Sequence, residues 1–337
     1  TPIMSSSTSS SDARWGGFGR TFLAAATLLA AALLALAFLV DPYDSGRSPL
    51  TLKTGVSPQG PRTAAASRGR DPQFSGAIFG NSHIQLVSPE QLAQQTGIPF
   101  VSLIAPATGP RESLVLLDWF LRHRKEQAKA LVIGIDVRWC TADPTLAIEK
   151  PFPFWLFESS IVRYLAGLLR FDVIEETLRR LRYLTAKQPE RARPDGYWDY
   201  EAGYEVQGFH SDPVRRAQLL EPLDISGGNA TGPFPAATAL RDLLDRLAPG
   251  VPVVLVRPPN FVSGLPKPGT PGAGADAACR DAYARLAAER PRTALVDWRV
   301  DRPENREPDN YFDHTHYRRK IAGPLAADIA AAIIGLR

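Results

Sequence analysis

The chain has 337 residues, of which 44% are hydrophobic and 22% are charged. Both proportions are ordinary for a folded globular protein, so they exclude wholesale disorder and a polytopic membrane protein. The formal net charge of +4 is small and is spread along the chain. Because nucleic-acid binding requires a concentrated basic surface or a recognisable motif, we expect no nucleic-acid partner.

An uncharged apolar run covers residues 21–40. As a helix rising about 1.5 Å per residue, it would span roughly 30 Å, the thickness of the hydrocarbon core of a bilayer. The run therefore predicts a single transmembrane anchor. A cleavable signal peptide is the alternative, because Ala35-Leu36-Ala37 resembles a cleavage site. The run is longer than most signal cores, which favours the retained anchor.

Charges on either side of this run predict its orientation. Arg14 and Arg20 precede it, whereas Asp41 and Asp44 follow it. The positive-inside bias then places residues 1–20 in the cytoplasm and the main domain on the other side of the membrane. We expect a single-pass protein of the inner (cytoplasmic) membrane with a periplasmic or other extracytoplasmic domain.

Residues 41–73 are rich in Pro, Gly, Ser, Thr and Arg and have no apolar period. This composition predicts a flexible linker whose ends lie on the order of 30 Å apart. Such a linker would hold a domain near the bilayer without fixing its orientation.

Short apolar runs alternate with helical patterns through residues 74–337. This alternation predicts an α/β domain with a parallel sheet and helices on both faces. In such sheets ligands bind beyond the C-terminal ends of the strands. A last helix is expected at about 318–336. The predicted strands are residues 76–79, 100–104, 131–135, 251–256 and 294–298.

The stretch between the third and fourth predicted strands is much longer than an ordinary crossover. We interpret residues 144–248, approximately, as a mainly helical insertion. Its aromatic residues Tyr197, Trp198, Tyr200 and Tyr204 either stack on a sugar or pack onto the domain. The sequence leaves both alternatives open.

Two cysteines, Cys140 and Cys279, are far apart in the sequence. They pair in an oxidising compartment if their Cα atoms come close enough, or they remain as small buried residues. Their spacing fits no metal site, and we expect no metal and no cofactor.

A candidate nucleophile follows the first predicted strand, in the segment Phe79-Gly80-Asn81-Ser82-His83. Ser82 stands at the C-terminal end of a strand, and Gly80 permits a tight turn there. Serines are common in such loops, so this signal is weak when taken alone.

A second signal is the segment Asp313-His314-Thr315-His316, just before the last helix. In a helical turn, residues three apart share a face, so Asp313 and His316 can hydrogen-bond. They would supply the base for a serine and the group that orients that base. The alternatives are a surface loop or a helix cap, and His314 is a second candidate for the base. Because both signals fall at the same sheet edge, they predict a triad of Ser82, Asp313 and His316.

The blocks FGNSH and DHTH together resemble those of the SGNH, or GDSL-type, hydrolase superfamily. More narrowly, FGNSHIQLVSPEQL and YFDHTHYRRKIAG are similar to a membrane-anchored branch related to D-alanine-transfer and alginate O-acetylation proteins. The resemblance implies a three-layer, flavodoxin-like α/β/α fold for residues 74–337.

The resemblance also implies an esterase or O-acyltransferase that forms an acyl-serine on a cell-envelope polysaccharide or glycolipid. An acylated carbohydrate or lipid would be the substrate, and a membrane-bound acyltransferase would be the partner. The alternative is a catalytically weak protein of the same fold that binds or assembles components of an envelope polysaccharide-modification system.

The family's oxyanion hole implies three donors: the N–H of Ser82, the N–H of Gly109, and an Asn side chain after the third strand. This chain has Asp136 at that point and no Asn. A carboxylate would repel a developing oxyanion, so we favour a salt bridge to Arg138 or a helix cap as the role of Asp136.

Several neighbours remain open as contacts for the oxyanion or the substrate. Asn81, Arg138 and Arg257 are the candidates to replace the missing donor, and His83 either contacts substrate or packs beside the serine turn. For Arg257, which follows the fourth strand, an anion site and a loop salt bridge are equally plausible.

Overall fold

A computed structural model of the chain describes residues 10–148, 150–186, 191–209, 211–223 and 228–337. Residues 1–9, part of the segment predicted to be cytoplasmic, lie outside the described residues. Five parallel strands form one sheet in the order β2-β1-β3-β4-β5, which confirms the predicted parallel sheet. The strands are β1 (Gly76–Gly80), β2 (Phe100–Ile104), β3 (Ala130–Gly134), β4 (Val253–Arg257) and β5 (Thr293–Asp297).

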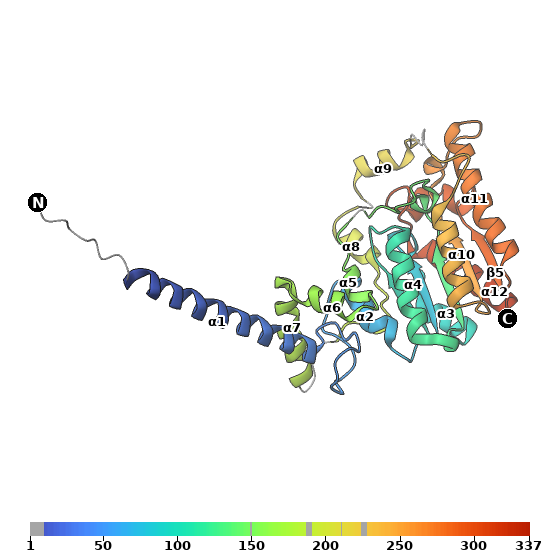
Figure 1. Ribbon diagram of the computed structural model, residues 1–337. Helices are drawn as coiled ribbons and strands as arrows, with labels where there is room; N and C mark the ends of the chain where they lie inside the picture. The colour runs from blue at the N-terminus through green and yellow to red at the C-terminus, as the bar shows by residue number, and fades with distance from the viewer. Residues whose placement is uncertain (1–9, 149, 187–190, 210, 224–227) are drawn as a thin grey trace, which may run out of the picture.

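Helices cover both faces of this sheet (Figure 1). On one face lie α2, α4, α10 and α11, and on the other lie α3 and α12. The helices are α1 (Ser10–Val40), α2 (Pro61–Arg70), α3 (Pro89–Thr96), α4 (Pro110–Arg124), α5 (Phe154–Phe157), α6 (Ile161–Leu168), α7 (Phe171–Thr185), α8 (Tyr200–Val206), α9 (Pro213–Leu220), α10 (Pro235–Leu247), α11 (Pro271–Glu289) and α12 (Arg319–Gly335).

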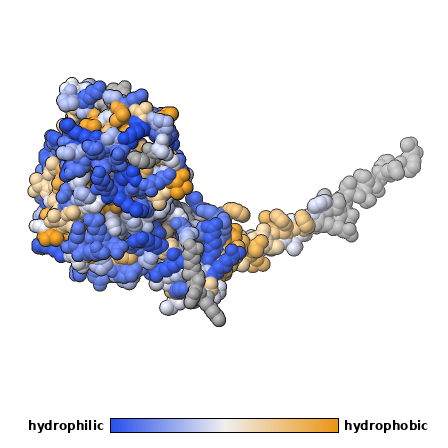
Figure 2. All heavy atoms as spheres, turned by 180° about the vertical axis from the view of Figure 1, so that it is seen from behind, coloured by the Kyte–Doolittle hydropathy of each residue, from blue (hydrophilic) through white to orange (hydrophobic). Residues whose placement is uncertain are grey.

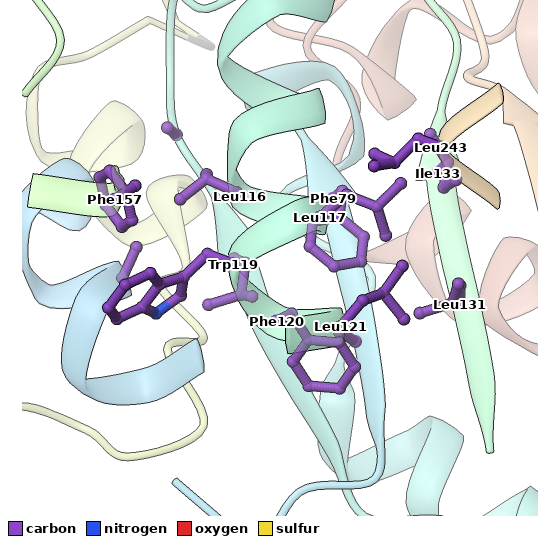
Figure 3. Packing of buried hydrophobic residues seen from close by; sticks show 14 of the residues in the cluster. Phe79, Leu116, Leu117, Trp119, Phe120, Leu121, Leu131, Ile133, Phe157 and Leu243 are labelled. Carbon is purple, nitrogen blue, oxygen red and sulfur yellow. The ribbon is translucent and has the colours of Figure 1, made fainter. Parts of the chain in front are cut away.

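The two-residue period of the strands divides their side chains between two cores. Phe79 and Ile133 point to the face covered by α4, where they pack with Leu117 and Phe120 (Figure 3). Their neighbour Ile78 points to the opposite face, against α3 and α12. Because both faces are buried, the strands are continuous apolar runs, and this is why the sequence locates them well.

Helix α1 projects from the domain, and its exposed part is mostly apolar (Figures 1 and 2). Its segment Trp15–Val40 is long and apolar enough to cross a membrane. The other end of the helix is part of the domain: Ala37 and Val40 are buried, and α1 packs against α6 and α7. The helix is unbroken through residues 35–37.

The flexible linker predicted for residues 41–73 is wrong. This segment contains α2, which packs on α4 and β2, and its residues Ala64, Ala65 and Ala66 are buried. Small alanine side chains let the helix approach the domain closely without an apolar period, so the pattern on which the prediction relied is missing.

A buried carboxylate fastens the segment that follows α1. Asp44 accepts hydrogen bonds from Ser67 Oγ at 2.7 Å and from the Gly55 N–H at 2.8 Å. It also pairs with Arg70 at 3.0 Å and with Arg180 of α7 at 3.5 Å. Asp44 thus ties the end of α1 to α2 and α7, and residues 41–73 form a folded neck.

The predicted insertion is mainly helical, but it ends earlier than residue 248. Helix α10 packs on α4 and leads directly into β4, so it is an ordinary crossover helix of the sheet. The remainder has two parts. Helix α5 packs with α6 and with α2 of the neck, and both α6 and α7 pack with α1. Helices α8 and α9 instead lie near the loop that precedes α12.

The two cysteines are paired. Cys140 ends a 3-10 turn (Val137–Cys140) that follows β3, and Cys279 lies in α11. Of the two open alternatives, the structure has the disulfide, which joins the loop after β3 to α11.

Candidate active site

Ser82 begins a short 3-10 turn, Ser82–Ile84, at the C-terminal end of β1. The turn requires glycine at position 80, where φ is +148°. A Cβ atom at Gly80 would also come within 2.8 Å of Ile84 Cγ2. Only glycine satisfies both constraints, as the sequence predicts. The turn leaves Ser82 half-buried at the sheet edge.

Three side chains from the two ends of the domain form a continuous hydrogen-bonded relay. The Ser82 Oγ atom lies 2.9 Å from His316 Nε2. The His316 Nδ1 atom lies 2.7 Å from Asp313 Oδ2. The structure therefore brings together the three residues predicted as a triad, at the distances that nucleophile and base require.

The segment that carries Asp313 and His316 is a closed bend, not the helical turn that the sequence suggests. A bridge between Tyr311 and Tyr317 closes it, and the Phe312 N–H donates to the His316 carbonyl oxygen at 2.8 Å. The final helix begins only at Arg319.

Asp313 organises this bend with its own side chain. Its Oδ1 atom accepts from the N–H of Thr315 at 2.8 Å and from the N–H of His316 at 2.9 Å. Burial raises the pKa of Asp313, but the hydrogen bond and charge of His316 and the two backbone N–H groups outweigh it, so its pKa lies well below the usual range. Asp313 is therefore a carboxylate at neutral pH, suited to orient His316 and stabilise its protonated form.

Helix α8 supplies an aromatic wall beside His316. The ring centroids of Tyr200 and Tyr204 lie 5.6 Å and 5.9 Å from that of His316. The Tyr200 hydroxyl donates to the Tyr317 carbonyl oxygen at 2.7 Å. Tyr200 is buried and thus packs onto the domain, while Tyr204 is half-exposed and Trp198 is exposed.

The wall is held by a carboxylate that the sequence analysis missed. Glu201 of α8 accepts from Arg318 Nε at 2.9 Å and from the Arg319 N–H at 2.6 Å, at the first turn of α12. A carboxylate at a helix N-terminus is favourable for both hydrogen bonding and the helix dipole. The two residues lie more than a hundred positions apart, and no local pattern signals their contact.

Asp136, buried after β3, is the centre of a second polar cluster. It accepts from Asn81 Nδ2 at 2.5 Å, and it lies 3.3 Å from His83 Nδ1. It also accepts from the Arg138 N–H at 3.0 Å and pairs with the Arg138 guanidinium at 3.2 Å. These contacts confirm the structural role predicted for Asp136, both as a salt-bridge partner and as a cap.

The charge of Asp136 is stabilised by these neighbours. Burial raises the pKa of this carboxyl group, but the contacts with His83, Asn81 and Arg138 outweigh it and lower its pKa below the ordinary value. Asn81 Nδ2 also donates to the Thr108 carbonyl oxygen at 3.0 Å. Asn81 therefore ties the loops after β1, β2 and β3 together and is committed to that task, not to an oxyanion.

Two of the predicted anion contacts are committed elsewhere. The Gly109 N–H donates to Glu112 Oε2 at 3.0 Å, within the first turn of α4. Arg257 is buried and pairs with Asp276 at 2.6 Å and with Asp297 at 2.7 Å. The oxyanion role for Gly109 is therefore wrong in this arrangement, and the loop salt bridge is the correct alternative for Arg257.

The remaining predicted contacts stay close to the serine turn. The Arg138 side chain passes beside Gly109, since a Cβ atom at Gly109 would lie 3.7 Å from Arg138 Cδ. The His83 ring lies edge-on to the His316 ring, with centroids 5.5 Å apart. His314 points away from the serine, and its Nε2 lies 3.0 Å from the Glu221 carbonyl oxygen. Of the two histidines predicted as candidates for the base, His316 is thus the one that faces Ser82.

A cavity of about 350 Å³ adjoins the relay between α9 and the bend. It is lined by Arg215, Leu219, Phe312, Asp313 and His314, among others. Its volume falls within the range of small-molecule sites.

A search of protein-family models and a search of curated proteins find no match to this chain.

Proposed function

We propose that the protein is a membrane-anchored serine acyl-ester enzyme of the SGNH type. The relay of Ser82, His316 and Asp313 carries this proposal, because serine, imidazole and carboxylate in this order are what nucleophilic acyl transfer needs. The strand order is that of flavodoxin-like sheets, and the serine lies at a strand's C-terminal end, where ligands of such sheets bind. Both observations support the assignment.

In the proposed reaction, Ser82 Oγ attacks the carbonyl carbon of an ester while His316 Nε2 accepts the hydroxyl proton. Asp313 keeps the other nitrogen of the ring protonated and stabilises the charged imidazolium. The alcohol leaves with the proton from His316, and an acyl-Ser82 ester remains. Water or a sugar hydroxyl, deprotonated by His316, then attacks this ester and restores the serine. The first acceptor makes an esterase, the second an O-acyltransferase.

The N–H of Ser82 is the oxyanion donor in this scheme. It donates to no acceptor among the described residues. Since one oxyanion donor is typically worth about 10²–10³ in rate, and the Gly109 N–H is committed to Glu112, turnover is expected to be slow. This same observation supports the second candidate, a binding or assembly protein with little turnover in an envelope polysaccharide-modification system.

We propose that the domain lies outside the cytoplasm, held in the inner membrane by α1. The disulfide between Cys140 and Cys279 supports this location, because such bonds persist in oxidising compartments. Retention of α1 is supported by Ala37, which is buried against the domain and would lose its contacts on cleavage at residues 35–37. An acylated carbohydrate or lipid of the envelope is the proposed substrate, and a membrane-bound acyltransferase is the proposed partner.

A fluorophosphonate probe tests the chemistry directly, because it reacts only with an activated serine. We expect labelling of the full chain, loss of labelling in Ser82→Ala, and a strong reduction in His316→Ala. Ser159→Ala, at an exposed serine outside the relay, is the matched control and should label normally. Absence of labelling in folded wild-type protein would refute the enzyme and favour the binding protein. Release of p-nitrophenol from an acetyl ester, with and without a sugar acceptor, separates esterase from transferase.

A further inference from the structure

Helices α6 and α7 expose large apolar side chains beside the end of α1. Five are well exposed, namely Val162 at 72%, Leu169 at 63%, Phe171 at 86%, Leu178 at 51% and Ile161 at 48%. Large apolar side chains exposed on two successive helices point to an interaction site, because soluble domains seldom leave such a group uncovered.

The exposed residues of α7 form a stripe. Phe171, Ile174 and Leu178 recur at intervals of three and four residues, and therefore share one face of the helix. The face toward the domain is separate and carries the buried residues Val173 and Thr177. The third face is charged and includes Glu175 and Arg179, which pair with each other. Helix α7 thus turns one face, with the buried Arg180 and Tyr183 as well, to the domain. Its apolar stripe lies on another face and is left exposed by the described chain.

The position of this stripe relative to α1 indicates what covers it. Both α6 and α7 pack directly on α1, at the end where that helix joins the domain (Figure 1). A hydrocarbon core takes about 20 helical residues, and counting these from Thr21, the first residue of the uncharged run, reaches Val40. Leu34 is already packed against the domain core, and Val40 is buried. The apolar part of α1 therefore continues up to the level of α6 and α7, with no polar spacer between.

We propose that α6 and α7 lie in the interface of the bilayer that α1 crosses and form a second membrane contact of the domain. An amphipathic helix in this position buries its apolar face at the level of the headgroups and upper acyl chains. Exposed Arg170 immediately precedes Phe171 at the start of α7, where phosphate groups of lipids would meet it. This inference rests on the proposed anchoring by α1.

Depth-dependent quenching in the full-length protein tests the contact. The two native cysteines are in a disulfide, so a single added cysteine can be labelled with the fluorophore NBD. Positions Phe171 and Leu178 report on the stripe, Leu28 reports on α1, and Val214 in α9 is the matched control, exposed to 63%. The protein is reconstituted in nanodiscs of phosphatidylcholine and phosphatidylglycerol with nitroxide-labelled acyl chains, and thermal unfolding of each variant checks its fold.

We expect blue-shifted emission and loss of fluorescence at positions 171 and 178, as at 28, and neither effect at 214. Quenching at position 28 but not at positions 171 and 178 would overturn the second membrane contact while leaving the anchor by α1 intact. The stripe would then be assigned to a membrane protein partner. Absence of quenching at 28 as well would refute the anchor, and the second contact with it. If Phe171→Cys does not fold, Val162→Cys replaces it on the same surface.

Discussion

Replacing Asp136 by asparagine tests whether its buried carboxylate holds the loops around the serine together. The substitution keeps the shape of the side chain but removes the charge that Arg138 and His83 face. It also places an amide where Asn81 donates at 2.5 Å. Removing one partner of a buried ion pair costs about 3–5 kcal/mol. Because Asn retains one acceptor oxygen, we expect about 3 kcal/mol at neutral pH, near the lower end of that range.

This loss converts into a measurable change of melting temperature. A domain of roughly 300 residues has an unfolding entropy of about 0.6 kcal/mol/K, so Tm should fall by about 5 °C. Thermal unfolding of the detergent-solubilised chain measures it. Asp281→Asn is the matched control, because Asp281 is exposed and its ion pair, within the described part of the chain, is with its neighbour Arg280. An exposed pair of this kind contributes at most about 1 kcal/mol.

The pH dependence gives a second criterion. The folded-state pKa of Asp136 is lowered, so its carboxylate contributes stability above the unfolded value of about 3.9. That contribution is lost as the pH falls through the folded-state pKa. The difference in Tm between wild type and Asp136→Asn should therefore shrink below about pH 4. Equal melting temperatures at neutral pH, or a gap that persists undiminished at about pH 3, would refute the reasoning.

Three further substitutions are predicted from the same contacts. Asp313→Asn removes the group that fixes the His316 tautomer and should slow fluorophosphonate labelling by up to about 10⁴; a rate near wild type would exclude the relay. Gly80→Ala places a Cβ atom on a residue with φ of +148° and should lower the free energy of unfolding, measured by chemical denaturation, by about 1–3 kcal/mol. Its control, Gly274→Ala in an exposed helical turn, should raise that free energy by up to about 1 kcal/mol. Cys279→Ser opens a loop of 139 residues and should lower stability by up to about 5 kcal/mol; an unchanged Tm in non-reducing buffer would contradict the disulfide.

The sequence predicts the sheet and the relay well because their signals are local. Strands β1 to β4 are short runs buried on both faces, as at Phe100–Ile104, where the observed bounds equal the predicted ones. The edge strand β5 is half-buried. Ser82 and His316 lie 234 residues apart. Their positions after the first strand and before the last helix nevertheless suffice to bring them to one edge, because all strands are parallel.

The features that the sequence misses depend on long-range polar contacts. The neck at residues 41–73 folds around Asp44, whose partners come from α2 and α7. Its sequence has no apolar period from which this folded structure could be predicted. The Gly109 N–H is taken by Glu112, and Arg257 is taken by Asp276 and Asp297. Which acceptor a donor chooses is decided by competition within the folded site, and spacing along the chain does not reveal it.

The folded neck limits how far Ser82 can move relative to the membrane. A flexible linker would let Ser82 occupy many positions relative to the membrane. Instead, the ion pairs of Asp44 with Arg70 and Arg180 fix the domain to the C-terminal end of α1. With α1 perpendicular to a bilayer, Ser82 would then lie at one fixed height above the membrane surface. If the proposed function holds, acyl donors and acceptors would have to reach Ser82 at that height. The length of the neck, more than the shape of the pocket, would then decide which envelope molecules can react.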